Sequence, residues 1–230
     1  MEPGKHSARR RTGGMSLGRR DILNLVLLLA VVAGLCVWLI HGPAALTAPG
    51  GEKATQTSTY DGLAVGNPKA APPLALKNYL GKPVKLASYL HRGKAVLVTF
   101  LYAHCPLICP LIASKLHATL AEMSAAERQR VQIIAVSVDP RGDTPSAVAQ
   151  FLADHGMTGK MQYLIGSASA LGAVWSRWGI GSKRDAGDPE LVAHTALVYG
   201  ITAKGEIITI YPDTFSPKEI VHDVPLLARA

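Results

Sequence analysis

The sequence predicts an α/β domain in which a central mixed sheet is flanked by helices. Residues 95–101 (AVLVTFL) and 131–138 (VQIIAVSV) form continuous apolar runs, which are typical of strands that are buried on both faces. Apolar side chains at helical spacing lie between them, so the two strands are expected to pair in parallel through a right-handed crossover. Later in the chain, two short apolar runs flank Ala203-Lys204-Gly205 and indicate a hairpin, which adds antiparallel strands.

The remaining elements follow from local signals. Gly81-Lys82-Pro83 indicates another hairpin, and Thr144 followed by Pro145 is a typical helix start. The expected elements are strands at 74–76, 84–86 and 95–101, a helix at 110–123, a strand at 131–138, a helix at 144–155, a strand at 161–165, a helix at 168–178, strands at 197–199 and 206–211, and a helix at 217–228. This order is typical of a thioredoxin-like fold with a cysteine loop between a central strand and the next helix.

The N-terminal part differs in composition from the rest. Residues 1–20 hold six Lys/Arg and one acid, and residues 22–40 form a nineteen-residue run in which Asn24 is the only clearly polar member. A helix of that length spans roughly 28 Å, which matches the hydrocarbon core of a bilayer. We therefore expect a basic cytoplasmic tail (1–21), a transmembrane anchor (22–41), a linker rich in Gly, Pro, Ala and Thr (42–66), and a thioredoxin-like domain (67–230).

The charge distribution predicts where the domain lies. The basic tail keeps the N-terminus in the cytoplasm and exports the rest by the positive-inside rule. A cleavable signal peptide is the alternative, but its apolar region is expected to be shorter. The short tail favours a bacterial inner membrane with the domain in the periplasm over the mitochondrial inner membrane facing the intermembrane space. Most of the net charge of +8 lies in the tail, so nucleic acid is set aside as a partner and membrane lipid is expected.

The chain has three cysteines, and two of them stand in the exported domain. Cys36 lies in the apolar run, where a packing or lipid-facing thiol is the simplest interpretation. Cys105 and Cys109 stand at the entry to the helix expected at 110–123, so their sulfurs lie within about one turn of each other. The helix N-terminus favours thiolate, which attacks disulfides and binds soft metals. A structural disulfide is the alternative, although a loop this short gains only roughly 2 kcal/mol.

Several motifs then occur in a fixed order. They are His104-Cys105-Pro106, Cys109-Pro110, Ser137-Val138-Asp139-Pro140, Asp143-Thr144-Pro145, His194-Thr195 and Lys204-Gly205. With this order over about residues 67–228, the sequence resembles the Sco/SenC family of copper proteins that help to assemble cytochrome c oxidase.

The resemblance implies a copper site made of Cys105, Cys109 and His194. Two thiolates and an imidazole suit Cu(I), whereas Cu(II) would want a further ligand such as water. It also implies a metallochaperone whose partners are the copper-bearing subunit of cytochrome c oxidase and other copper chaperones. The same two cysteines, as redox-active thiols that can form a disulfide, would serve a thiol–disulfide oxidoreductase acting on the oxidase cysteines, or a copper or redox sensor. Whether the chain is an enzyme therefore stays open at this point.

Two positions depart from the family pattern. Leu107 stands where the family usually has an acid between the cysteines, and Ala193 stands where it often has Asp before the histidine. Both changes remove carboxylates near the expected site, which bears on partner recognition and redox poise rather than on the three ligands.

Neighbouring residues have structural interpretations. His104 is the first alternative ligand, but it should point away from Cys105 if the chain is extended there. Asp139 ends a buried strand, where it could approach the site or form a turn. The remaining candidates are interpreted as packing residues: Met123, Met157, Met161, Trp175 and Trp178.

The apolar run and the basic tail generate a prediction of topology. A reporter fused to the C-terminus should be active outside the cytoplasm, because residues 22–41 are expected to anchor the chain and residues 42–230 to be exported. The same fusion without residues 1–41 should be active in the cytoplasm. A full-length fusion that is active only in the cytoplasm would contradict this topology.

Overall fold

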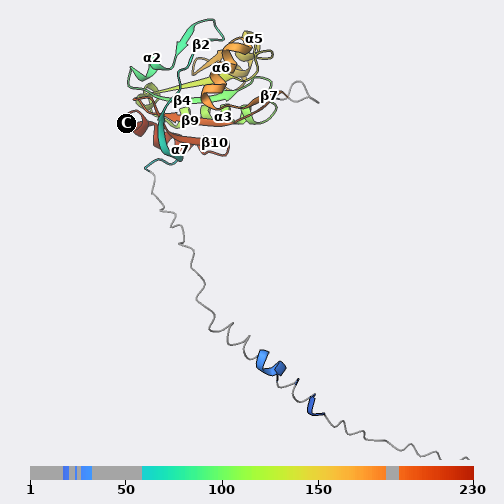
Figure 1. Ribbon diagram of the computed structural model, residues 1–230. Helices are drawn as coiled ribbons and strands as arrows, with labels where there is room; N and C mark the ends of the chain where they lie inside the picture. The colour runs from blue at the N-terminus through green and yellow to red at the C-terminus, as the bar shows by residue number, and fades with distance from the viewer. Residues whose placement is uncertain (1–17, 21–23, 25–26, 33–58, 185–191) are drawn as a thin grey trace, which may run out of the picture. The chain divides into compact units, whose positions relative to one another are not determined.

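The computed structural model describes residues 18–20, 24, 27–32, 59–184 and 192–230 (Figure 1). The chain divides into two compact units, Met1–Gln56 and Thr57–Ala230. In the first unit, residues 19–20, 24 and 27–32 are helical, and the expected anchor at 22–41 lies largely outside the described residues. Among the residues described, no helix has the length and the apolar content needed to cross a membrane.

The second unit contains an eight-stranded mixed sheet with the strand order β1-β10-β9-β4-β5-β6-β2-β3. Its strands are β1 (Leu63–Ala70), β2 (Ala75–Asn78), β3 (Pro83–Lys85), β4 (Ala95–Leu101), β5 (Val131–Ser137), β6 (Met161–Ile165), β9 (Leu197–Ile201) and β10 (Glu206–Pro212). β5 pairs in parallel with both β4 and β6, whereas β9 and β10 pair antiparallel with their neighbours. The α/β fold with a central mixed sheet is therefore confirmed.

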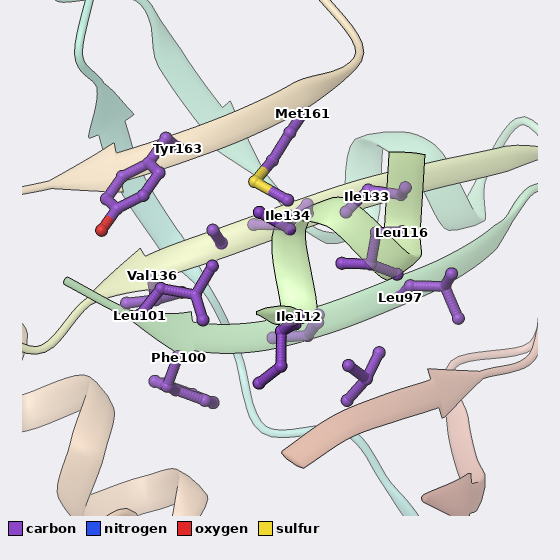
Figure 2. Packing of buried hydrophobic residues seen from close by; sticks show 14 of the residues in the cluster. Leu97, Phe100, Leu101, Ile112, Leu116, Ile133, Ile134, Val136, Met161 and Tyr163 are labelled. Carbon is purple, nitrogen blue, oxygen red and sulfur yellow. The ribbon is translucent and has the colours of Figure 1, made fainter. Parts of the chain in front are cut away.

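Six helices of this unit surround the sheet among the residues described. They are α2 (Ala87–Leu90), α3 (Ile108–Glu122), α4 (Ala125–Gln129), α5 (Pro145–Asp154), α6 (Ala168–Trp178) and α7 (Pro217–Leu227). α3 packs against α7, and its Ile112 and Leu116 lie among the apolar side chains of β4 and β5 (Figure 2). Phe100 of β4 meets the ring of Trp178 of α6 at 5.7 Å between centroids. All residues of β4 are buried, so this strand is covered on both faces.

The sequence predicts most of these elements to within a few residues. β4 has the predicted bounds, and Thr144 caps α5 by accepting a hydrogen bond from the Ala147 N–H at 3.2 Å. The parallel pairing of β4 with β5 and the antiparallel hairpin of β9 and β10 are confirmed as well.

Other elements differ from the expectation. β1 begins at Leu63, inside the residues assigned to the linker, and the small helices α2 and α4 carry no prediction. A separate two-stranded sheet of β7 (Ser182–Arg184) and β8 (Val192–His194) is also new. β1 shows no apolar period because most of its side chains are exposed and its register shifts between Ala64 and Lys69.

A buried carboxylate fastens the start of the domain to α7. Asp223 is fully buried and accepts hydrogen bonds from the backbone N–H groups of Asp61 and Gly62 at 2.8 and 2.9 Å. The Tyr211 hydroxyl and His222 Nδ1 each lie 2.8 Å from its oxygens. A side chain on Gly62 would collide with Tyr211, so glycine lets the backbone approach this closely. The network ties the entry to β1 to α7 and to β10.

We expect Asp223→Ala to destabilise the domain by about 2 to 4 kcal/mol, because two backbone donors and the buried Tyr211 hydroxyl lose a charged acceptor. Denaturant unfolding of the variant against the parent protein measures this. Asp154→Ala is the matched control, since this exposed carboxylate accepts only from the Gln150 side chain among the described residues, and it should change stability by less than about 0.5 kcal/mol. Equal effects of the two substitutions would contradict the role of Asp223.

Candidate metal centre

The end of β4 leads into the cysteine loop, which starts α3. The Cys105 N–H donates to the carbonyl of Tyr102 at 3.3 Å, and this turn carries Cys105 to the first turn of the helix. Leu107 is the N-cap residue and offers no side-chain acceptor. Instead, the Cys109 N–H donates to Cys105 Sγ at 3.3 Å. The sulfur therefore takes the place that a Ser or Asp oxygen usually fills at a helix N-terminus.

The two cysteines are free thiols with different acidities. A hydrogen bond from Cys109 is the main cause that lowers the pKa of Cys105 to about 3, and His194 and backbone N–H groups add to it against the effect of burial. The pKa of Cys109 is raised, because its hydrogen bond to Cys105 and its burial both favour the thiol. Cys105 is thus the thiolate of the pair, and Cys109 keeps its proton.

His194 reaches the cysteines from the end of β8. Its Nε2 lies 3.6 Å from Cys109 Sγ, although the two residues are 85 apart in the sequence. Its Nδ1 lies 3.1 Å from the Thr195 carbonyl oxygen, which can only accept. Nδ1 therefore carries a proton, and Nε2 is the ring nitrogen that faces the sulfur. Nε2 is therefore the nitrogen through which this imidazole would bind a metal.

The three predicted ligands lie in one site, but their ligand atoms are farther apart than they would be around a single bound ion. Among the described residues, only Asp61, His222 and Asp223 bring three such ligand atoms within 4.8 Å of one another. Zinc, for comparison, binds sulfur and nitrogen at about 2.0 to 2.3 Å. Three ligand atoms around one such ion therefore lie within 4.8 Å of one another. The cysteine loop or β8 must shift slightly to close around a metal. The Asp61 cluster is the Asp223 network of the fold.

Tyr102 lies between the cysteine loop and β8, which carries His194. No signal in the sequence identifies this tyrosine. Its side chain is 2% exposed, and its hydroxyl accepts the Val192 N–H at 3.3 Å. Its ring meets the His194 imidazole edge to face at 5.7 Å. Burial is the main cause that raises the pKa of Tyr102 to about 12, and the nearby Cys105 also raises it.

Two buried acids, Asp139 and Asp143, follow the end of β5, and one of them contacts the loop. Asp143 accepts the Ala103 N–H at 2.7 Å and the Tyr163 hydroxyl at 3.0 Å. Burial is the main cause that raises the pKa of Asp143 to about 6, against the effect of these donors. Asp139 is also buried and accepts the Arg141 N–H at 3.1 Å, so it forms a turn. Asp143 thus holds the start of the cysteine loop through the Ala103 N–H, while Asp139 shapes its own turn.

The remaining sequence candidates take the following places. His104 is exposed, and its ring lies beside Gly142 and the carboxylate of Asp139. Leu107 is 70% exposed and Ala193 is exposed, so the positions where the family has acids present apolar surface to solvent. The other candidates pack in or against the core, as expected: Met123, Met157, Met161, Trp175 and Trp178.

The burial of Asp143 generates a prediction of pH dependence. A carboxyl whose pKa is raised in the folded state destabilises the fold once it ionises, so this cost grows between pH 4 and pH 6 and persists above that. Each pKa unit corresponds to about 1.4 kcal/mol. The free energy of unfolding of Asp143→Asn, relative to that of the parent protein, should therefore rise by up to about 3 kcal/mol between pH 4 and pH 7. Unfolding free energies of both proteins across this range measure the effect, and parallel curves would contradict it.

Comparison with known proteins gives a consistent result. The SCO1/SenC family model matches residues 66–229. The mouse protein described as "Protein SCO1 homolog, mitochondrial" is 26% identical over 185 residues, which is 78% of this chain and 63% of the mouse protein. The chain thus spans less than two thirds of the length of that relative.

Two solved structures share the fold. Bradyrhizobium japonicum ScoI with copper bound matches with a TM-score of 0.57 and 26% identity, over 69% of this chain and 99% of its own. BsSco matches with a TM-score of 0.57 and 26% identity, over 73% of this chain and 96% of its own. That structure is described as showing a disulfide switch in a member of the Sco family of cytochrome c oxidase assembly proteins. The thioredoxin-like arrangement is therefore confirmed, and the chain belongs to the SCO1/SenC family.

Proposed function

We propose that this protein is a copper metallochaperone that acts outside the cytoplasm and helps to mature the copper centre of cytochrome c oxidase. One observation carries the proposal: His194 Nε2 meets Cys109 Sγ at 3.6 Å in the loop that also holds Cys105. Cys105, Cys109 and His194 would bind the copper. Relatives support the cargo, because the B. japonicum structure holds copper and shares 26% identity with this chain.

The donor set fits copper by its chemistry. Thiolate sulfur is soft and selects Cu(I), and imidazole suits both oxidation states of copper. Cys105 is already a thiolate, and Nε2 is the ring nitrogen of His194 that faces the cysteines. Cys109 must lose its proton on binding, so uptake should release a proton and be favoured as the pH rises. Copper would leave when an acceptor offers better ligands through shared thiolate and imidazole contacts.

The partner and the location belong to the same proposal. The acceptor would be the copper-bearing subunit of cytochrome c oxidase, with other copper chaperones as donors. The segment 22–41 would hold the domain at a bacterial inner membrane on the periplasmic side. The exposed Leu107 and Ala193 leave the mouth of the site without the carboxylates that these positions usually supply. Recognition there would depend on apolar contact more than on charge.

A thiol–disulfide oxidoreductase is the second candidate, and the unequal acidity of the cysteines favours it. The Cys105 thiolate would attack one sulfur of a partner disulfide and expel the other as a thiolate. Cys109 would then give up its proton and attack the mixed disulfide, which releases the reduced partner and leaves a Cys105–Cys109 disulfide. Two electrons pass to the partner in total. Cys105 is 9% exposed whereas Cys109 is fully buried, so Cys105 is the attacking residue.

Copper binding by His194→Ala tests the proposed site. The reduced full-length chain in detergent should bind close to one copper, and its oxidised form should bind little, because a disulfide removes both thiolates. His194→Ala should lose Cu(II) binding and weaken Cu(I) binding, since two thiolates alone still hold Cu(I). Its dithiol should still cycle to a disulfide, because an imidazole is not needed for thiol exchange. Elemental analysis and the Cu(II) absorption spectrum measure these outcomes.

Two further histidines provide the controls. His91 is exposed and lies outside this site, and its side chain has no hydrogen bond among the described residues, so His91→Ala should bind copper as the parent protein does. His104→Ala tests the first alternative ligand. An unchanged Cu(II) spectrum in His194→Ala would overturn the site. If oxidase assembly in cells survives His194→Ala but not Cys105→Ala, the oxidoreductase replaces the chaperone as the function.

A further inference from the structure

The histidine ligand stands on a ribbon that is separate from the main sheet. β7 and β8 pair only with each other among the described strands, with Ser182 opposite His194 and Lys183 opposite Ala193. The cysteines instead follow β4, the fully buried central strand. A site made of Cys105, Cys109 and His194 is therefore complete only when this ribbon is held against the end of β4.

Few hydrogen bonds hold the described part of the ribbon to the body of the domain. The Tyr102 hydroxyl accepts the Val192 N–H at 3.3 Å, two residues before the histidine. The Ser182 hydroxyl donates to the Val138 carbonyl at 3.1 Å, at the end of β5. The first of these is the closer to the site, because the same tyrosine ring lies edge to face with His194 at 5.7 Å.

Tyr102 also belongs to the cysteine side of the site. It directly follows β4, and its carbonyl accepts the Cys105 N–H at 3.3 Å. Its hydroxyl also lies near the Cys105 sulfur. One buried residue thus contacts the backbone of the ribbon and the imidazole ring through its side chain, and the cysteine loop through its carbonyl.

We propose that Tyr102 is a positioning residue, whose hydroxyl and ring set the place of His194 relative to Cys105 and Cys109. This inference rests on the proposed copper function. A backbone hydrogen bond at Val192 fixes the strand, and the aromatic edge limits the rotation of the imidazole. Phenylalanine would keep the ring but lose the hydroxyl, so it would loosen the ribbon without opening a cavity in the core.

The test is a double-mutant cycle with Cu(I) as the probe, measured by chelator competition on the reduced full-length chain in detergent. Tyr102→Phe should weaken Cu(I) binding by about three- to tenfold, the loss expected for one buried hydrogen bond. In the His194→Ala background, where no imidazole remains to be positioned, Tyr102→Phe should change Cu(I) affinity by less than about twofold. A merely structural tyrosine would not show this dependence on His194.

Two variants complete the design. Tyr199→Phe is the matched control, since its hydroxyl has no hydrogen bond among the described residues, and it should leave Cu(I) affinity unchanged. Ser182→Ala removes the other fastening of the ribbon, so it should also weaken binding only when His194 is present. It carries the same test if Tyr102→Phe lowers the unfolding midpoint too far for titration.

The outcomes separate the two proposals. Equal weakening by Tyr102→Phe in both backgrounds would mean that the tyrosine acts independently of His194, and the positioning role would be overturned. No weakening in either background would overturn it as well, while the copper site would stand. A parent protein that binds no Cu(I) would remove the proposed function, and the inference with it.

Discussion

The site depends on the complete burial of β4. A strand that is covered on both faces cannot carry polar chemistry along its length, so the first reactive side chains appear where it ends. Tyr102 and Cys105 come directly after this end, and Asp139 and Asp143 follow the end of the parallel neighbour β5. Because parallel strands bring their carboxyl ends to one edge of the sheet, these residues meet without any long connection. The ribbon with His194 then completes the arrangement from outside the sheet.

The sequence predicts the parts of the fold whose signals are local. The apolar run of β4 and the Thr144-Pro145 start of α5 are visible in the sequence because burial and capping act within a few residues. β1 gives no such signal: it is an edge strand with exposed side chains, and its pairing with β10 joins residues that are more than 130 apart. The place of β1 is set by Asp223, whose partners the sequence cannot reveal without the fold.

In the candidate site, too, residues with local signals are predictable from the sequence, and residues that depend on distant contacts are not. Cys105 and Cys109 are recognisable by their spacing at a helix start, whereas His194 is one histidine among eight, and only the order of motifs in the family selects it. Tyr102 has no signal at all, because its role is a contact with Val192 that spans ninety residues. The different acidities of the two cysteines also require the structure, since they depend on which sulfur accepts and which sulfur donates.

The absence of a side-chain cap on Leu107 gives the cysteine loop a property of its own. The Cys109 amide donates to Cys105 Sγ, and the first turn of α3 has no serine or aspartate oxygen to replace it. A metal ion, a second sulfur or an oxidant that takes electron density from this sulfur competes with the amide for it. The chemical state of this sulfur is therefore coupled to the hydrogen bonding of the first turn of α3, so a change at the cysteine also changes the backbone at the start of the helix.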